Sequence, residues 1–220
     1  MSTFEVYYAR LAGLGETTRC LLDYADAKWT NTYMEEWAEI ATTTPYGKVP
    51  VLRETTTDGQ HIELCESRAI ERYLARRFGL YSDDLVEAAR IDAVASQFDD
   101  AMRPLGAARF GPEAARPALM EHYRKEVTRL FTRHGAQLAA NGNNGHYFGD
   151  RTTWADIVAY MGIRTLGHYE PFDEELWALK TKSHQKLIDI LEADPNFRRY
   201  LERSESRLAS YVPLPPPNVN

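Results

Sequence analysis

The sequence predicts a protein of two domains: an α/β N-terminal domain over residues 1–81 and an all-α C-terminal helical bundle over residues 86–220. Strand-type alternation and helix-type periodicity follow each other through the first eighty residues, whereas only helical periodicity remains beyond them. The length of 220 residues also exceeds the usual size of one domain without reaching that of three.

Composition and charge exclude several classes of function. With 44% hydrophobic and 26% charged residues, the chain resembles an ordinary globular protein. The net charge is −6 and basic residues are interspersed among acidic ones, so the sequence predicts no basic patch for binding nucleic acid. No basic cluster precedes an apolar run at the start, and no eighteen apolar residues are consecutive, so we expect neither export nor a membrane span. We therefore expect a small-molecule substrate.

The cysteines indicate the compartment. Cys20 and Cys65 are the only two, and they form neither a Cys-x-x-Cys pair nor a metal-ligating spacing. Their scarcity fits a reducing environment. We expect a cytoplasmic protein without a bound metal.

The first element is a strand that ends at Tyr8, because Phe4, Val6 and Tyr8 alternate with other residues on one face. A helix follows, with one apolar face and one charged face that we expect to point away from the core. The apolar face contains Thr18, Leu21, Leu22 and Ala25, and the charged face contains Arg19, Asp23 and Asp26.

The rest of the N-terminal domain continues with short strands. We expect strands over 29–34, 49–53 and 61–65, with turns at 45–47 and 58–59. A helix over 67–78 follows, and Gly79 is placed to terminate it.

The C-terminal domain shows apolar residues at helical spacing. Its predicted core positions are Ala88, Ile91, Val94, Ala95, Phe98, Leu119, Tyr123, Val127, Leu130 and Phe131. A loop is expected over 141–145, and Thr153 with Asp156 predicts a capped helix start. The proline-rich stretch 212–217 cannot continue a helix, and we expect it to be extended.

Three patterns offer chemistry, and the first is Tyr8 at the end of its strand. A turn containing Gly13 follows, then Glu16, and Arg19 lies eleven residues after Tyr8. A phenol at this place is a candidate hydrogen-bond donor to a ligand. The structural alternative is that Tyr8 packs in the core, which is the reading we give to Tyr7.

The second pattern is the stretch 46–52, Tyr-Gly-Lys-Val-Pro-Val-Leu. A cis bond before Pro50 would present the backbone N–H and C=O of Val49 to a peptide lying alongside. A trans proline at the first residue of an edge strand is the alternative.

The third pattern is Glu66-Ser67, which follows a strand and opens a helix. The N–H groups of a helix N-terminus, together with a serine hydroxyl, suit a bound carboxylate. An ordinary N-cap serine is the alternative.

In this order the three patterns resemble the cytosolic glutathione S-transferase family, in particular its tyrosine-type classes, with sigma nearest and pi close to it. The resemblance covers nearly the whole chain. It implies a thioredoxin-like N-terminal domain, and conjugation of the thiolate of reduced glutathione to small hydrophobic electrophiles, as in detoxification. Glutathione would be a co-substrate, and no further cofactor is implied. A homodimer is also implied, with Tyr46 at the position where some classes insert an aromatic side chain into the partner subunit.

The resemblance also assigns residues. Tyr8 would activate the thiol, and Asp100 would reach the glutathione of the neighbouring subunit. Thr153 to Asp156 would match the family's capping box. The implied glutathione-binding residues are Tyr8, Trp37, Lys48, Val49, Pro50, Glu66, Ser67 and Asp100. The expected electrophile pocket, between the domains, is lined by Arg10, Met102, Arg103 and Phe110.

Two departures and three alternatives accompany this reading. Leu14 stands where many relatives have an arginine, and Ala41 where many have a lysine, which leaves Lys48 as the candidate cation. Glutathione-dependent isomerisation of the prostaglandin type would use the same thiolate. A non-catalytic ligand-binding or structural protein would keep the fold alone. A cysteine-type transferase would need a cysteine near position 8, and none is there.

Overall fold

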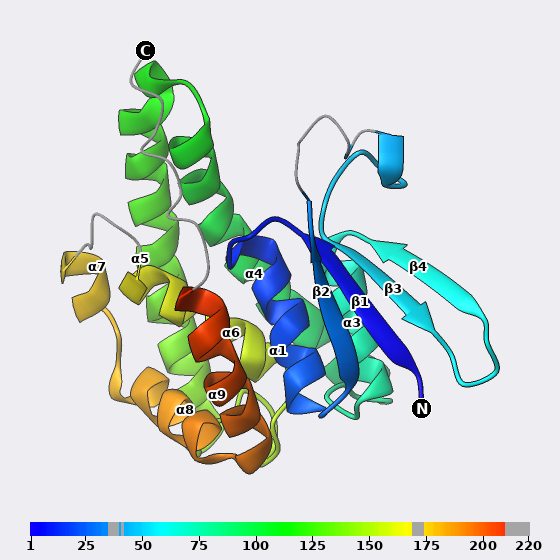
Figure 1. The fold of residues 1–220 in the computed structure, drawn as a ribbon. Helices are drawn as coiled ribbons and strands as arrows, with labels where there is room; N and C mark the ends of the chain where they lie inside the picture. The colour runs from blue at the N-terminus through cyan, green and yellow to red at the C-terminus, as the bar shows by residue number, and fades with distance from the viewer. Residues whose placement is uncertain (35–39, 41, 169–173, 210–220) are drawn as a thin grey trace. The chain divides into compact units, whose positions relative to one another are not determined.

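The computed structural model describes residues 1–34, 40, 42–168 and 174–209. It contains two compact units (Figure 1), one built from 1–81 together with the segment that begins at 192, the other from 82–191. No helix among the described residues is long and apolar enough to cross a membrane. We describe each unit separately.

The first unit is built on a four-stranded mixed sheet in the order β2-β1-β3-β4. Its strands are β1 (Thr3–Tyr8), β2 (Lys28–Tyr33), β3 (Val51–Thr55) and β4 (His61–Cys65). β1 pairs with β2 in parallel and with β3 antiparallel, and β3 pairs antiparallel with β4. β3 begins two residues later than predicted, after Pro50, which has no N–H for a ladder.

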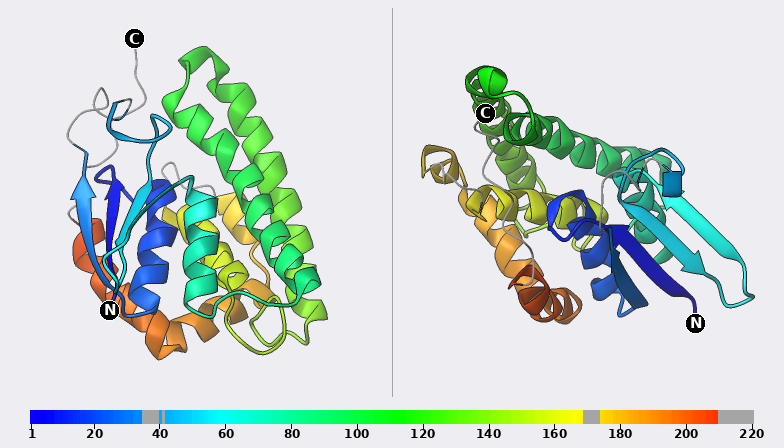
Figure 2. Two further views of the ribbon diagram at one scale, coloured as in Figure 1. Left: turned by 90° about the vertical axis from the view of Figure 1, so that its right-hand side faces the viewer. Right: turned by 45° about the horizontal axis from the view of Figure 1, so that its top comes forward.

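Helices cover the sheet of the first unit. They are the short 3₁₀ turn η1 (Gly13–Gly15), α1 (Glu16–Tyr24), α3 (Ser67–Arg77) and α9 (Pro195–Ala209). α1 and α3 lie side by side on one face of the sheet (Figure 2), and α9 packs against α1. Ile70 and Leu74 of α3 are fully buried, and Gly79 follows the helix with φ of +74°, as a terminating glycine should.

One expectation about α1 was wrong. Arg19 and Asp23 were predicted to face away from the core, yet both are 0% exposed, and only Asp26 is exposed. The reason is that α9, nearly 180 residues further along, covers the charged side of α1 with arginines of its own. Helical periodicity recognises apolar burial but not the burial of paired charges.

The second unit is helical. Its elements are α4 (Leu85–Phe110), η2 (Glu113–Ala115), α5 (Arg116–Ala140), α6 (Trp154–His168), α7 (Glu174–Ala178) and α8 (Lys182–Ala193). α4 packs against both α5 and α6. The periodic positions from Ala88 to Phe98 and from Tyr123 to Phe131 are buried as predicted, whereas Leu119 is only half-buried.

The start of α6 confirms the predicted capping box. The Asp156 carboxylate accepts hydrogen bonds from the backbone N–H of Thr153 at 2.7 Å and from its hydroxyl at 2.8 Å. It also accepts the backbone N–H of Tyr147 at 2.8 Å, so one buried carboxylate joins the loop before α6 to the helix.

The compact units and the predicted domains differ in one place. The segment from 192, which includes α9, packs with the first unit, whereas the predicted domains follow the order of the chain. The predicted extended stretch 212–217 lies outside the described residues.

Candidate functional site

The sheet register brings the three sequence patterns to one edge. Tyr7 of β1 pairs with Val51 of β3, and Val51 pairs with Cys65 of β4. Continuing each pairing by one residue puts Tyr8, Pro50 and Glu66 in a row across three neighbouring strands. With about 4.8 Å between strands, the row is about 10 Å wide. We call Tyr8, Pro50 and Glu66 the edge row.

Two helices begin at this edge. α1 starts shortly after β1, and α3 starts directly after β4, with Ser67 as its first residue. The N-terminus of a helix carries a partial positive charge and N–H groups without partners inside the helix. The edge row therefore lies where anionic groups are favoured.

Tyr8 is held by the turn that follows it. Its ring is 7% exposed, and its hydroxyl oxygen accepts the backbone N–H of Leu14 at 2.9 Å. Gly13 has φ of +42°, and a Cβ there would lie 2.5 Å from the hydroxyl. A Cβ on Gly15 would lie 2.6 Å from the ring. The glycines thus permit the close approach that fixes the phenol.

The environment of Tyr8 keeps its hydroxyl protonated. Burial raises the pKa of Tyr8 above its ordinary value of 10.0, although the N–H of Leu14 and the charge of Arg19 act in the opposite direction. Because Leu14 donates to the oxygen, the hydroxyl hydrogen is left for another acceptor.

The loop before β3 has the predicted cis bond between Val49 and Pro50. Pro50 is buried, Val49 is half-buried and Lys48 is exposed. Ladder pairing with β1 begins only at Val51, so Lys48 and Val49 precede the paired part of the strand. Tyr46, in the same loop, is 69% exposed.

Glu66 has an unusual backbone. Its φ of +68° and ψ of 113° fall in a sparsely populated region, and its side chain does not cap α3. Asp26 and Asn143 also have positive φ, but aspartate and asparagine adopt such angles more readily than glutamate. Strain of this kind gathers at binding sites, and here it falls in the edge row.

The remaining predicted residues fall in three groups. Arg10 lies in the first unit, exposed, with its guanidinium 4.3 Å from the ring centroid of Tyr33. Trp37 and Ala41 lie outside the described residues. The others are all on α4 of the second unit: Asp100, Arg103 and Phe110 are exposed and Met102 is half-buried. Their part in a common site stays a prediction.

Two contributors were missed from the sequence. One is the backbone N–H of Leu14, because a main-chain donor leaves no trace in residue type. The other is Arg19, whose guanidinium carbon lies 5.3 Å from the ring centroid of Tyr8. The spacing of eleven residues from Tyr8 is visible in the sequence, but the charge of Arg19 predicts exposure and not burial beside the ring.

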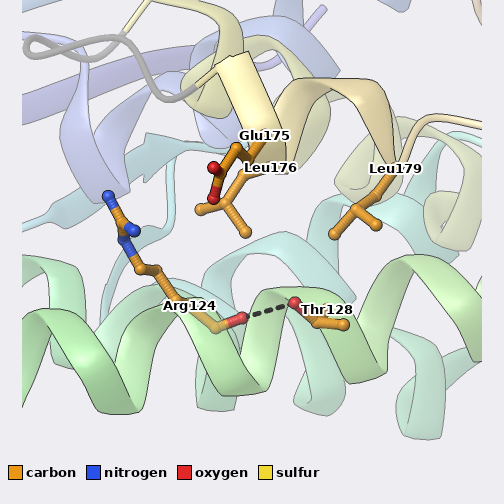
Figure 3. Close-up of a pocket in the computed structure, with 5 residues that line it drawn as sticks. All are labelled: Arg124, Thr128, Glu175, Leu176 and Leu179. Carbon is orange, nitrogen blue, oxygen red and sulfur yellow. Dashed lines mark hydrogen bonds between the residues drawn. The ribbon is translucent and has the colours of Figure 1, made fainter.

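The second unit has a pocket of about 240 Å³ between α5 and α7 (Figure 3). Leu176 and Leu179 point toward α5, where the hydroxyl of Thr128 donates to the backbone oxygen of Arg124 at 2.8 Å. Glu175 completes the lining. None of the predicted residues lines this pocket, so it does not replace the edge row as the candidate site. The described part of the chain shows no cluster of side chains suited to a metal ion.

Comparison with known proteins identifies the family. Residues 19–82 match the family described as glutathione S-transferase, N-terminal domain, and residues 99–204 match glutathione S-transferase, C-terminal domain. The two matches follow each other along the chain, the N-terminal model before the C-terminal one.

Individual relatives agree. "Probable glutathione S-transferase gst-36" of Caenorhabditis elegans is 31% identical over 94% of this chain and 99% of its own length. The chicken (Gallus gallus) protein named hematopoietic prostaglandin D synthase is 32% identical over 77% of this chain and 82% of its own. A sigma class GST of Fasciola hepatica has the same fold, with a TM-score of 0.75 at 24% identity over 92% of this chain and 96% of its own. The chain belongs to the glutathione S-transferase family of enzymes.

Proposed function

We propose that this protein joins the sulfur of reduced glutathione to small hydrophobic electrophiles, with the Tyr8 hydroxyl stabilising the thiolate. The observation that carries the proposal is the edge row. An extended tripeptide is about 10 Å long, so the γ-glutamyl and cysteinyl residues of glutathione together fall within the width from Tyr8 to Glu66. A peptide lying along this row would have its carboxylate near the start of α3 and its thiol near Tyr8.

The assignment of groups follows from their chemistry. Ser67, at the start of α3, would hold the α-carboxylate of the γ-glutamyl group, and Glu66 its amine. The backbone of Val49 would pair with the cysteinyl part of the peptide. Lys48 would face the glycine carboxylate.

The energetics allow Tyr8 to perform the activation. A free thiol has a pKa of about 8.5, and the thiolate is the nucleophile. Lowering this pKa by about two units requires roughly 2.7 kcal/mol. One hydrogen bond to a charged group contributes about 1.5–3 kcal/mol, so the phenol comes close to being sufficient. The N–H of Leu14 polarises the phenol and strengthens its donation.

In the reaction, the thiol proton leaves to solvent and the sulfur lone pair forms a bond to the electrophilic carbon. The leaving group departs with the electron pair of the broken bond. Tyr8 donates throughout and loses no proton, since burial raises its pKa. No cofactor besides glutathione enters this scheme.

The deciding experiment compares Tyr8→Phe with Tyr7→Phe. Tyr7 is its neighbour in β1, equally buried, and packs beside Arg53. With glutathione and a chloronitrobenzene, Tyr8→Phe should lower kcat/KM about 10- to 100-fold at neutral pH, the equivalent of one hydrogen bond to an anion. The KM for glutathione should change less than threefold, and Tyr7→Phe should stay within twofold of the wild type. Equal activity of Tyr8→Phe and wild type would refute the role.

Isomerisation is the second candidate, because a relative at 32% identity is named a prostaglandin D synthase. The same thiolate would bond to one endoperoxide oxygen as the O–O bond breaks and the other oxygen takes a proton. Loss of the proton on the adjacent carbon would then form the carbonyl and release the thiolate from oxygen. Product analysis separates the two, since isomerisation consumes no glutathione. Absence of both activities, together with no retention on immobilised glutathione, would favour a non-catalytic binding protein instead.

The finer properties are part of the same proposal. We place the protein in the sigma class, in the cytoplasm and in a homodimer with the exposed Tyr46 at the interface. Asp100 would then serve the partner's glutathione. Sedimentation of the wild type and of Tyr46→Ala tests the dimer.

A further inference from the structure

The loop that positions Tyr8 is clamped by Arg19. The Arg19 guanidinium donates through Nη1 to the backbone oxygen of Leu11 at 2.8 Å, and through Nη2 to that of Ala9 at 3.4 Å. Both acceptors lie between Tyr8 and Leu14, whose N–H holds the phenol. Arg19 is fully buried, so this clamp is part of the core.

Glu16 connects the clamp to α9. Its Oε2 accepts a hydrogen bond from Arg19 at 3.0 Å. Its Oε1 accepts from Nη2 of Arg207 at 3.1 Å and from the hydroxyl of Tyr200 at 3.3 Å. Glu16 is 6% exposed, so these partners replace most of its water. One carboxylate therefore joins the Tyr8 loop to α9.

Arg207 is firmly held in this arrangement. Its side chain is 11% exposed, and its guanidinium carbon lies 5.4 Å from the ring centroid of Trp29. It also donates to the Asp23 carboxylate at 3.2 Å. A buried guanidinium with two carboxylate partners has little freedom to move.

We infer that Arg207 is a positioning residue for the Tyr8 site, acting through Glu16 and Arg19. Arg207 offsets the negative charge of Glu16, which otherwise opposes an anion at Tyr8. It also keeps Glu16 in the position from which that carboxylate orients Arg19. The inference rests on the proposed function, because it concerns the thiolate that Tyr8 stabilises.

The test uses Arg207→Gln with Arg203→Gln as the matched control. Arg203 lies one turn earlier on α9 and binds Asp23 at 3.4 Å and Asp26 at 2.7 Å. Both variants remove one positive charge and one contact to Asp23. Arg207→Gln also removes the ion pair with Glu16 at 3.1 Å. The readout is the pH profile of kcat/KM for glutathione conjugation.

Arg207→Gln should move the profile to higher pH by about half a unit to one unit, which is about a 3- to 10-fold loss below the apparent pKa. Arg203→Gln should leave the profile within twofold of the wild type. A merely structural contribution of Arg207 would lower activity equally at every pH. An unshifted profile in a folded Arg207→Gln variant overturns the inference.

A double-mutant cycle with Glu16→Gln tests the route. If Arg207 acts through Glu16, then Arg207→Gln should have no further effect in the Glu16→Gln background. An equal shift in both backgrounds would contradict that route. Arg207→Lys keeps the charge and should restore most of the profile. Should Arg207→Gln not fold, Arg207→Lys and Glu16→Gln decide: the inference requires the former to stay near wild type and the latter to shift the profile, and an unshifted profile in Glu16→Gln overturns it.

A readout without turnover separates this inference from the proposed function. Carbon-13 labelling of the tyrosine Cζ atoms gives one NMR signal for Tyr8, which Tyr8→Phe identifies. At neutral pH that signal should move in Arg207→Gln and stay in place in Arg203→Gln. An inactive wild type would refute the proposed function alone, whereas an unmoved Tyr8 signal in Arg207→Gln would refute the link from α9 to Tyr8.

Discussion

The two units bury polar side chains in opposite ways. The first unit holds a charged cluster, in which carboxylates of α1 meet arginines of α1 and α9: Glu16, Arg19, Asp23, Arg203 and Arg207. The second unit holds a histidine cluster of neutral groups: Gln97, His134, Tyr147 and His184. In the charged cluster, ion pairs offset the cost of burying charged groups. In the histidine cluster, the buried rings are neutral at pH 7. The stability contributions of the two clusters should therefore respond differently to pH.

The histidine cluster is arranged for neutral rings. Nδ1 of His134 lies 2.7 Å from the Tyr147 hydroxyl and its Nε2 lies 3.2 Å from Oε1 of Gln97, which suits a neutral ring that accepts from the hydroxyl and donates to the amide oxygen. Burial, and then the nearby His184, lower the pKa of His134 to about 4. Burial, and then Lys180, lower the pKa of His184 to about 4. A proton on either ring costs stability.

The charged cluster contains a carboxylate whose burial outweighs its partners. Burial raises the pKa of Asp23 above its ordinary 3.8, although Trp29, Arg207 and Arg203 all act to lower it. A raised pKa in the fold means that stability is greatest while Asp23 is protonated and falls as pH rises through the folded pKa. Mild acid should therefore favour this group while it opposes the histidines.

Acidification gives the largest expected difference between the clusters. The folded pKa of about 4 lies below the ordinary 6.5 of each histidine, so the folded state binds fewer protons in that interval. Stability should fall as pH drops from about 6.5 to about 4, by up to about 3 kcal/mol per histidine. Urea unfolding at a series of pH values, followed by circular dichroism, measures the loss. The His134→Gln variant should show a shallower dependence, and equal slopes for both proteins would be inconsistent with the role of His134.

Removing one hydroxyl from the histidine cluster should have an intermediate effect. Tyr147→Phe leaves Nδ1 of His134 buried without its donor, which should cost about 1–3 kcal/mol of unfolding free energy. Chemical denaturation at pH 7.5 is the measurement. In a His134→Phe background the same change should cost much less, and an undiminished cost there would show that the hydroxyl acts elsewhere.

The smallest effect is expected at Asp23 in the charged cluster. Asp23→Asn should cost less than about 1 kcal/mol at pH 7, because the desolvation penalty that raises the pKa of Asp23 is relieved as the ion pairs with Arg207 and Arg203 are lost. In the wild type, the indole N–H of Trp29 donates to the Asp23 carboxylate at 2.9 Å. The amide oxygen of the asparagine can accept this hydrogen bond in its place. Thermal and urea unfolding against wild type test it. A loss above about 3 kcal/mol would mean that the ion pairs stabilise the unit on balance.

Much of the local structure could be predicted from the sequence. Alternation at Phe4, Val6 and Tyr8 predicts β1, and His61–Cys65 has the predicted bounds of β4. Thr153 with Asp156 predicts the start of α6, since the capping box depends on residues three positions apart. These features are local, and local spacing is what a sequence displays directly.

Features that depend on distant partners could not be predicted in this way. Each member of the edge row is visible in the sequence, but their alignment comes from two strand pairings. The burial of Arg19 and Asp23 depends on α9, and charged residues are ordinarily read as solvent-facing. The donor to Tyr8 belongs to a main chain whose geometry residue types do not specify.

The contact between Glu16 and Arg207 joins residues 191 positions apart in the chain. A ribosome adds about 5–20 residues per second, so Glu16 is incorporated about 10–40 s before Arg207. During that interval the Glu16 carboxylate can pair with Arg19 but not yet with Arg207. The contact between α9 and the Tyr8 loop is therefore a late event of biosynthesis, and a chain stalled before α9 would lack the arginine that pairs with Glu16.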